Sequence, residues 1–375
     1  MPTERTHLPE RNLDVLRAFA VLGVLANHLD MAVGDTTATG LWIGYWLGRA
    51  GVLAFFVHTS LVLMASLERQ GEPRPRHWVG AFYIRRGFRI YPLAIVTIVG
   101  VLAAHYGPEV PIVGVTNPFV MPMAGAIAAN LALVQNLFDV KGVQAVLWTL
   151  PVEVQMYAVL PLCYLAARRG VGPVLALFLV GVGGGYLYTA DVVRGLWRFN
   201  TLAFVPCFMA GVLAYAILRR RAVRAVLPSW VWFVLLPANL IVFWAIGVRG
   251  ADAGFVWETH HWLQWGYCLV IALAIPVVRE LAPGPIARGG KLIAKYSYGI
   301  YLLHMPALAI GLVTLRHAPL AVQWLVAAAG IVLLPVIGYH LIEEPGIRAG
   351  VWLAGRWAHD RRVTRTLDAA EDAAP

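Results

Sequence analysis

The stretch LDVLRAFAVLGVLANH, residues 13–28, decides the fold because, after Asp14 at its start, Arg17 and His28 interrupt a largely apolar run. Arg17 and His28 are eleven residues apart, so an α-helix places them within roughly 20° of each other and about 16 Å apart along its axis. Charged side chains inside a bilayer cost on the order of 2.5–3.5 kcal/mol each on insertion scales, and they therefore face protein rather than lipid. The stretch predicts a membrane-spanning helix whose polar face lines a cavity.

The composition of the whole chain supports a membrane protein. Of the 375 residues 59% are hydrophobic and only 13% are charged, and the apolar runs are repeatedly near the roughly 20 residues that a bilayer requires. This pattern excludes an ordinary soluble domain. The first run is too long for the core of a cleavable signal peptide, so we expect it to remain as the first span. The predicted fold class is all-α, a polytopic transmembrane helical bundle.

Ten spans are expected, with a short re-entrant or surface helix over 124–138. An even number of spans places both termini on one side of the membrane. Residues 1–348 are predicted to form the membrane domain, followed by a tail over 349–375 that is first basic, then acidic and partly disordered. The expected spans are 13–31, 41–66, 88–106, 146–167, 172–190, 201–218, 230–248, 261–279, 296–315 and 320–342.

The positive charges indicate which side faces the cytoplasm. With these spans, 24 of the 30 Lys and Arg residues fall on the side that carries the termini. Positive residues concentrate in cytoplasmic loops, so both termini are expected in the cytoplasm and the protein in the bacterial cytoplasmic membrane. The net charge of +10 is spread over every inner loop. Nucleic-acid binding would need a concentrated basic patch, so no nucleic-acid partner is expected.

One inner loop contains more arginines than membrane topology alone requires. In FYIRRGFRIYP, residues 82–92, Arg85, Arg86 and Arg89 stand at the start of the third expected span. Forked, permanently charged guanidinium groups suit phosphate oxygens. The alternative is an anchor for lipid headgroups. Because Arg17 lies at the same membrane face, we favour a phosphate-binding site.

A buried carboxylate is expected in TLPVE, residues 149–153. Thr149 could cap a helix with Pro151 in its first turn, and Glu153 would then also lie in that turn, where the helix dipole favours an anion. The alternative is a functional role, because Glu153 and His28 reach similar depths in the membrane and could meet.

Metal and disulfide sites are not expected. Cys163, Cys207 and Cys268 lie in apolar stretches without ligand spacing and are predicted to be packing residues. His260 and His261 lie among tryptophans typical of an interfacial aromatic belt. At the end of the last span, the pair at 343–344 is expected to be solvated or paired with Arg348.

Six motifs in order carry a resemblance to a known family. They are Arg17 to His28, FFV (55–57), RGFR with IYP (86–92), Trp148 to Tyr157, SYGIYLLHMP (297–306) and IEEP (342–345). Together they resemble the acyltransferase 3 family of integral membrane O-acyltransferases, over about residues 11–348.

The resemblance implies transfer of an acyl group, often acetyl, from cytoplasmic acyl-CoA to a hydroxyl of a glycan, glycolipid or macrolide-like acceptor. Acyl-CoA would be a donor substrate, with no tightly bound cofactor. His28 would be the general base, Glu153 would orient it or balance its charge, and the CoA phosphates would bind Arg17 with the arginines of the third span (Arg85, Arg86, Arg89). A histidine suits this role because its usual pKa lies near 6.5.

The chain also departs from the family pattern. Relatives usually have Phe-Phe-x-x-Ser-Gly where this chain has FFVHTS, residues 55–60. His58 could line the substrate cavity or be a packing residue, and His304, before the helix-bending Pro306, is a further cavity candidate. No nucleophile elbow of the G-x-S-x-G type is present, which favours direct attack on the thioester.

Transport is the rival function. A ten-span protein with intramembrane His, Arg and Glu could export or flip a lipid-linked sugar. Transporters often contain two related halves, but the motifs around Arg17 and Arg86 have no counterpart in the second half of this chain. A non-catalytic sensor would not require an arginine cluster together with a buried histidine.

Overall fold

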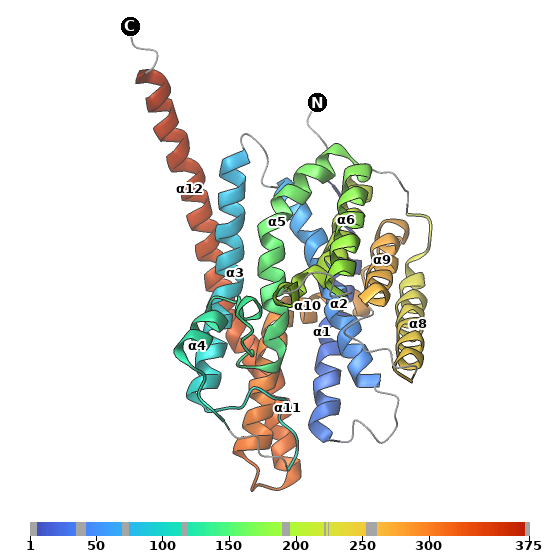
Figure 1. Ribbon diagram of the computed structural model, residues 1–375, viewed down its shortest axis with the longest axis vertical. Coiled ribbons are helices and arrows are strands. Elements are labelled where there is room, and N and C mark those ends of the chain that lie inside the picture. Colours follow the sequence, from blue (N-terminus) through green and yellow to red (C-terminus); the bar gives the residue numbers. More distant parts are fainter. Residues whose placement is uncertain are drawn as a thin grey trace.

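The computed structural model describes residues 6–34, 43–69, 75–114, 119–189, 196–220, 223, 225–252 and 261–371, and most of these residues are helical. Figure 1 shows the long helices side by side in one bundle, with α4 beside the lower part of α3. The elements are α1 (Glu10–Val33), α2 (Ile43–Arg69), α3 (Pro75–Ala103), α4 (Ala124–Leu131), η1 (Gln135–Phe138), η2 (Ala145–Trp148), α5 (Thr149–Arg169), α6 (Val171–Thr189), η3 (Leu196–Phe204), α7 (Val205–Arg220), η4 (Ser229–Val231), α8 (Trp232–Asp252), α9 (His261–Val277), α10 (Pro285–Ala309), η6 (Ile310–Thr314), α11 (Leu320–Gly338), η7 (Tyr339–Glu343) and α12 (Glu344–Glu371).

Nine of the described helical segments are long and apolar enough to cross a membrane. The one expected span that is not among these nine is the eighth along the chain, 261–279. It forms α9, which is apolar but has only 17 residues. The third span begins earlier than expected, because α3 starts at Pro75 rather than at 88. The short helix expected over 124–138 is present as α4 and η1.

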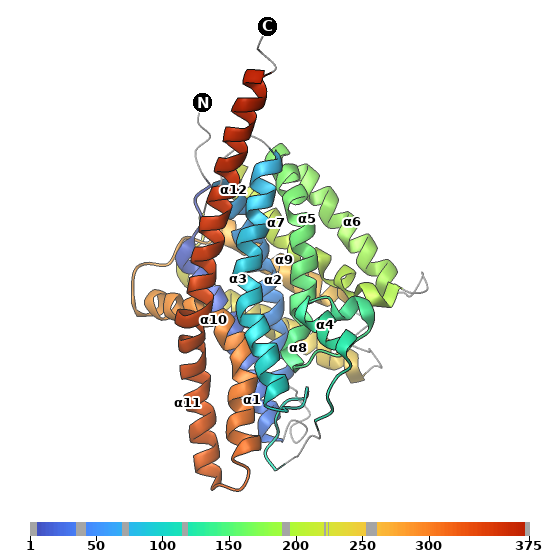
Figure 2. The same cartoon turned by 90° about the vertical axis from the view of Figure 1, so that its left-hand side faces the viewer.

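The last helix runs past the expected boundary of the membrane domain. Helix α12 is continuous from Glu344 to Glu371, so residue 348 lies within it. The division at that residue stays a prediction. Helix α1 begins and α12 ends at the same end of the molecule (Figures 1 and 2), which agrees with an even number of crossings.

The centre of the bundle is formed by α1, α2, α7 and α10. Helix α1 packs against α2 and α10, and α2 also packs against α7. Two glycines allow α1 and α2 to approach closely: a Cβ at Gly51 would lie 2.4 Å from the Ala20 carbonyl oxygen, and one at Gly23 would lie 2.9 Å from the Leu47 carbonyl oxygen. Any larger residue there would force the helices apart.

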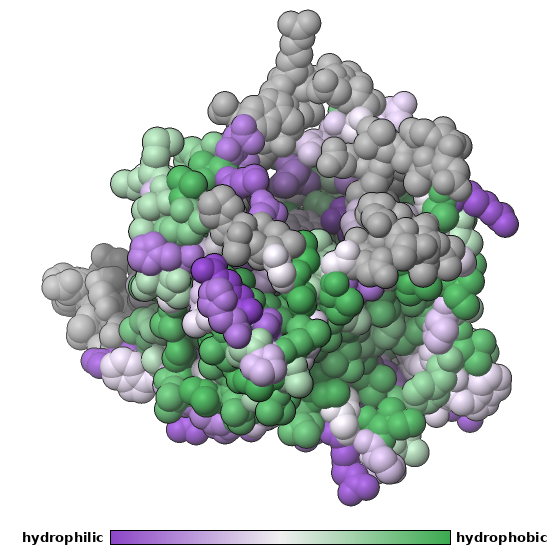
Figure 3. All heavy atoms as spheres, turned by 90° about the horizontal axis from the view of Figure 1, so that it is seen from below, coloured by the Kyte–Doolittle hydropathy of each residue, from purple (hydrophilic) through white to green (hydrophobic). Residues whose placement is uncertain are grey.

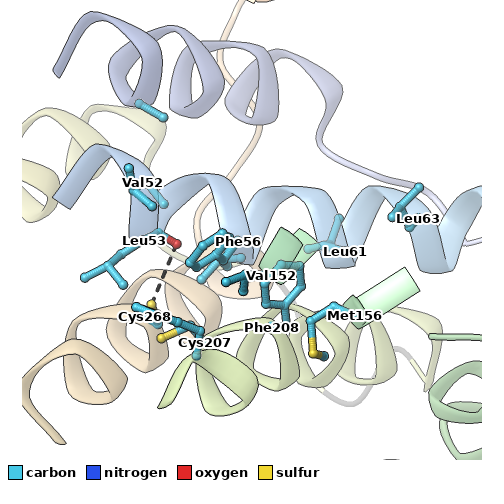
Figure 4. Close-up of a cluster of buried hydrophobic side chains, with 14 of the residues drawn as sticks. Val52, Leu53, Phe56, Leu61, Leu63, Val152, Met156, Cys207, Phe208 and Cys268 are labelled. Carbon is cyan, nitrogen blue, oxygen red and sulfur yellow. Dashed lines mark hydrogen bonds between the residues drawn. The ribbon is translucent and has the colours of Figure 1, made fainter. Parts of the chain in front are cut away.

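Apolar side chains fill the space between α2, α7 and α9. Figure 4 shows Phe56 of α2 beside Phe208 of α7, and Leu53 of α2 beside Cys268 of α9. The Phe56 and Phe208 rings stack with centroids 4.6 Å apart. The three cysteines are free and buried, which confirms their predicted packing role. This core holds α2 in place as one wall of the polar site.

The outer helices expose apolar side chains. Val180 of α6, Ile241 of α8 and Leu325 of α11 are each more than half exposed. Figure 3, a view along the bundle, shows hydrophobic residues over much of the visible face. A surface of this kind is stable only when lipid covers it.

Candidate active site

Three arginines from two helices meet inside the bundle. Arg17 of α1 and Arg86 and Arg89 of α3 line one cavity, of about 70 Å³, and we call these three side chains the guanidinium layer. Helix α3 contributes two of them because residues 86 and 89 are three apart and share a face. The cavity is also lined by His58, Glu153, Tyr157 and Tyr298.

Carboxylates and hydroxyls hold the guanidinium layer in place. Arg17 donates from Nε to the Ser297 hydroxyl at 2.6 Å, and Arg89 forms an ion pair with Glu343. Glu153 accepts a hydrogen bond from the Tyr157 hydroxyl. Removing a charge from water costs several kcal/mol unless it is paired and hydrogen-bonded, so these partners help Arg17 and Arg89 to be buried. Among the described residues, Arg86 Nε is buried without a hydrogen-bond partner.

A second cavity continues from the first. It measures about 60 Å³ and shares Arg17, Thr59, Glu153 and Tyr298 with the first cavity. It extends along α2 and α10 to Phe55, Val52, Thr149 and Tyr301. The Tyr301 hydroxyl donates to the Val146 carbonyl at 2.7 Å and lies 2.6 Å from the Thr149 hydroxyl. These hydroxyls mark the end of the polar space farthest from Arg86 and Arg89.

Two imidazoles meet beyond this end. His28 Nδ1 lies 3.0 Å from His304 Nε2, and His304 Nδ1 lies 2.7 Å from the Ile300 carbonyl oxygen. We call them the histidine pair. Along α10, Ser297 contacts Arg17, Tyr301 follows one turn later, and His304 comes three residues after that. Among the described residues, neither imidazole of the pair lines the two cavities.

Several predicted site residues are thus brought together. Arg17, Arg86, Arg89, Glu153 and His58 line one cavity. His58 is buried. Arg85 lines neither cavity, and its backbone lies against Gly350 of α12 instead.

The expected meeting of Glu153 with His28 is not formed. Glu153 is the fifth residue of α5, not part of its first turn, and the Thr149 hydroxyl bonds to Tyr301 rather than capping the helix. Since Thr149 is level with Tyr301, Glu153 lies one turn closer to the arginines. His28 bonds to His304 instead.

Glu343 and Glu344, at the end of the last span, were expected to be solvated or paired with Arg348, and this is correct only for Glu344. Glu344 does accept a hydrogen bond from Arg348 at 2.7 Å. Glu343, however, is 1% exposed and pairs with Arg89. It ends the π-helical turn η7, whose wider winding changes the direction of the following side chains. A buried arginine cluster needs counter-ions, and that requirement was the one indication of Glu343 in the sequence.

Within the described part of the chain, no group of three or more His, Cys, Asp or Glu side chains could hold a metal ion. His260 lies outside the described residues. His261 Nδ1 lies 2.7 Å from the Gln264 amide nitrogen.

Comparison with known proteins establishes the family. The sequence model of the acyltransferase domain, of the acyltransferase 3 family, matches residues 10–340. The chain belongs to this family, as its motifs indicated, and is a multi-pass membrane acyltransferase. Family membership also favours this function over transport. No solved structure matches the chain.

Two curated relatives are similar over nearly the whole chain. Nodulation protein 10 of Rhizobium leguminosarum bv. viciae is 26% identical over 371 residues, which cover 92% of this chain and 95% of that protein. Peptidoglycan O-acetyltransferase OatA of Listeria monocytogenes serovar 1/2a (strain ATCC BAA-679 / EGD-e) is 25% identical over 377 residues, covering 91% of this chain. The matched region is 56% of OatA.

Proposed function

We propose that this protein transfers an acyl group, in particular acetyl, from cytoplasmic acyl-CoA to a hydroxyl of a carbohydrate, glycolipid or glycosylated small molecule. The observation that carries the proposal is the arrangement along α1, where Arg17 of the guanidinium layer and His28 of the histidine pair lie about 16 Å apart on one face. The two connected cavities begin at the guanidinium layer and extend toward the histidine pair.

The guanidinium layer is suited to the anionic end of the donor. Three arginines face two carboxylates, Glu153 and Glu343, so the cluster keeps an excess of positive charge. Guanidinium groups bind phosphate oxygens through pairs of parallel hydrogen bonds. The second cavity, along α2, would then take the arm that carries the thioester, with its reactive carbon directed toward Thr149 and Tyr301.

His28 is suited to be the general base. In the proposed step, the acceptor hydroxyl gives its proton to His28 while its oxygen bonds to the thioester carbon. The bond from that carbon to sulfur then breaks, and the proton passes from His28 to the departing thiolate. His28 is half-buried near the end of α1, so the acceptor would approach from the end of the bundle opposite to the donor. Glu153 would act on the donor side, by balancing the charge of the arginines.

The acceptor class rests on the relatives. OatA is named for O-acetylation of peptidoglycan, and similarity to it supports a glycan acceptor here. The distribution of Lys and Arg supports cytoplasmic termini and a place in the bacterial cytoplasmic membrane. In that orientation the guanidinium layer is reached from the cytoplasm, where acyl-CoA is present.

The test uses the purified protein with radiolabelled acetyl-CoA and a panel of glycan, glycolipid and macrolide acceptors. We expect label transfer by the wild type, and a loss of about 100-fold or more in kcat for His28→Ala, because general base catalysis contributes about 10²–10⁴-fold. Binding of CoA should be unchanged in this variant. His317→Ala, an exposed histidine next to Arg316, is the control. Equal transfer by the wild type and His28→Ala would remove His28 from the mechanism.

A further inference from the structure

We infer that His304 is a positioning residue that sets the tautomer of His28 and accepts the hydrogen bond of the imidazolium formed during acyl transfer. The inference rests on the proposed function and adds to it the identity of the basic nitrogen. It is carried by the two hydrogen bonds of His304, one to a carbonyl and one to His28.

The first bond fixes the protons of His304. A carbonyl oxygen only accepts, so His304 Nδ1, at 2.7 Å from the Ile300 oxygen, must carry a hydrogen. His304 is fully buried, and within the described residues no carboxylate bonds to it. A buried charge without a partner is strongly unfavourable. His304 is therefore neutral, and its Nε2 presents a lone pair.

The second bond then fixes the protons of His28. Since His304 Nε2 accepts, His28 Nδ1 at 3.0 Å must donate. In neutral His28 the remaining lone pair is on Nε2, which is thereby assigned as the atom that takes the proton of the acceptor hydroxyl.

The same geometry excludes a proton relay through the pair. After His28 Nε2 takes a proton, its Nδ1 still donates to His304 Nε2, and this bond now has a charged donor, which strengthens it. Onward transfer would require His304 to lose its Nδ1 proton to a backbone carbonyl, which is not a base. The proton stays on His28 Nε2 until the thiolate receives it.

The first experiment compares two substitutions of His304 under steady-state conditions. His304→Leu removes the acceptor, whereas His304→Gln retains one in its side-chain carbonyl. Because a hydrogen bond to a charged group contributes about 10- to 100-fold, we expect His304→Leu to lower kcat by that factor, with the donor KM within about two-fold of wild type. His304→Gln should recover most of the loss. Equal loss in both variants, a change confined to KM, or an unaffected His304→Leu would overturn the inference.

The second experiment does not depend on activity. Nitrogen-15 NMR of histidine-labelled protein distinguishes the two neutral tautomers, and the His28 signals are assigned by their absence in His28→Ala. We expect His28 to be protonated on Nδ1 in the wild type. Protonation on Nε2 would overturn the assignment. If the wild type transfers no acyl group to any acceptor, the proposed function fails, and this spectrum still decides the hydrogen bonding of the pair.

Discussion

The guanidinium layer and the histidine pair each take one side chain from the same face of α1, Arg17 and His28, but the two groups are buried in different ways. Arg17 and Arg89 are permanently charged, and each has a buried partner: the Ser297 hydroxyl for the first and Glu343 for the second. His28 and His304 can be neutral, and they satisfy each other without a carboxylate. The difference supports the proposal that one end of the site holds an anion and the other exchanges a proton.

The largest effect should come from breaking the buried ion pair. Arg89→Met leaves the carboxylate of Glu343 buried and unpaired, which should lower the free energy of unfolding by about 3–5 kcal/mol. The double variant Arg89→Met/Glu343→Met should recover most of this stability but still bind CoA weakly. Thermal unfolding in detergent micelles and calorimetric titration with CoA measure the two effects separately. Full CoA affinity in the double variant would contradict a phosphate-binding role for Arg89.

A smaller effect should separate donor binding from chemistry. Arg17→Lys keeps the positive charge but loses the planar fork, including the Nε–H that bonds to Ser297. We expect the donor KM to rise about ten-fold, the value of one hydrogen bond, with kcat within about three-fold. This is the reverse of the change expected for His304→Leu. Steady-state kinetics with varied acetyl-CoA measure it, and a loss confined to kcat would place Arg17 with the histidine pair instead.

The smallest effect concerns an ion pair at the surface. Glu280 accepts hydrogen bonds from the Arg11 side chain at 2.8 Å and from its backbone N–H at 3.1 Å, and the Arg11 hydrogen bond lowers the pKa of Glu280 below its usual 4.5. The pair therefore stabilises the fold fully above about pH 4.5, and this contribution is lost as the pH falls through the lowered pKa.

Melting temperatures of the wild type and Glu280→Gln between pH 3 and 7 test this prediction. The two curves should differ slightly at neutral pH, converge in acid, and lie closer together in high salt, because exposed pairs are screened. A difference as large as that of Arg89→Met would mean that burial is not what separates the two ion pairs.

Much of the helical framework and half of the site could be predicted from the sequence. Apolar runs gave the spans, and the spacing of residues 17 and 28 gave the polar face of α1. The start of α3 was missed because residues 75–87 are helical but too polar to resemble a span. Hydropathy reports the part of a helix that lipid covers, not a part such as this one, where Trp78 and Phe82 are buried against protein and Arg86 lines a cavity.

The partners of the site residues could not be predicted. His28 and His304 are 276 residues apart, and Arg89 and Glu343 are 254 apart. Periodicity gives the face of each helix but not the rotation of one helix against another. The position of Glu343 depends in addition on the π-helical turn η7, which no local propensity indicates.

The glycine contacts between α1 and α2 fix the position of each helix relative to the other. Gly51 and Gly23 lie against the backbone of the opposite helix, so neither helix can slide along the other without a clash. The distance along α1 between the Arg17 guanidinium and the His28 imidazole is then set by helical rise alone. A donor shorter than that spacing could not touch both groups at once. The length of the thioester arm, rather than the chemistry of its acyl group, would then be the first property by which the site selects its donor.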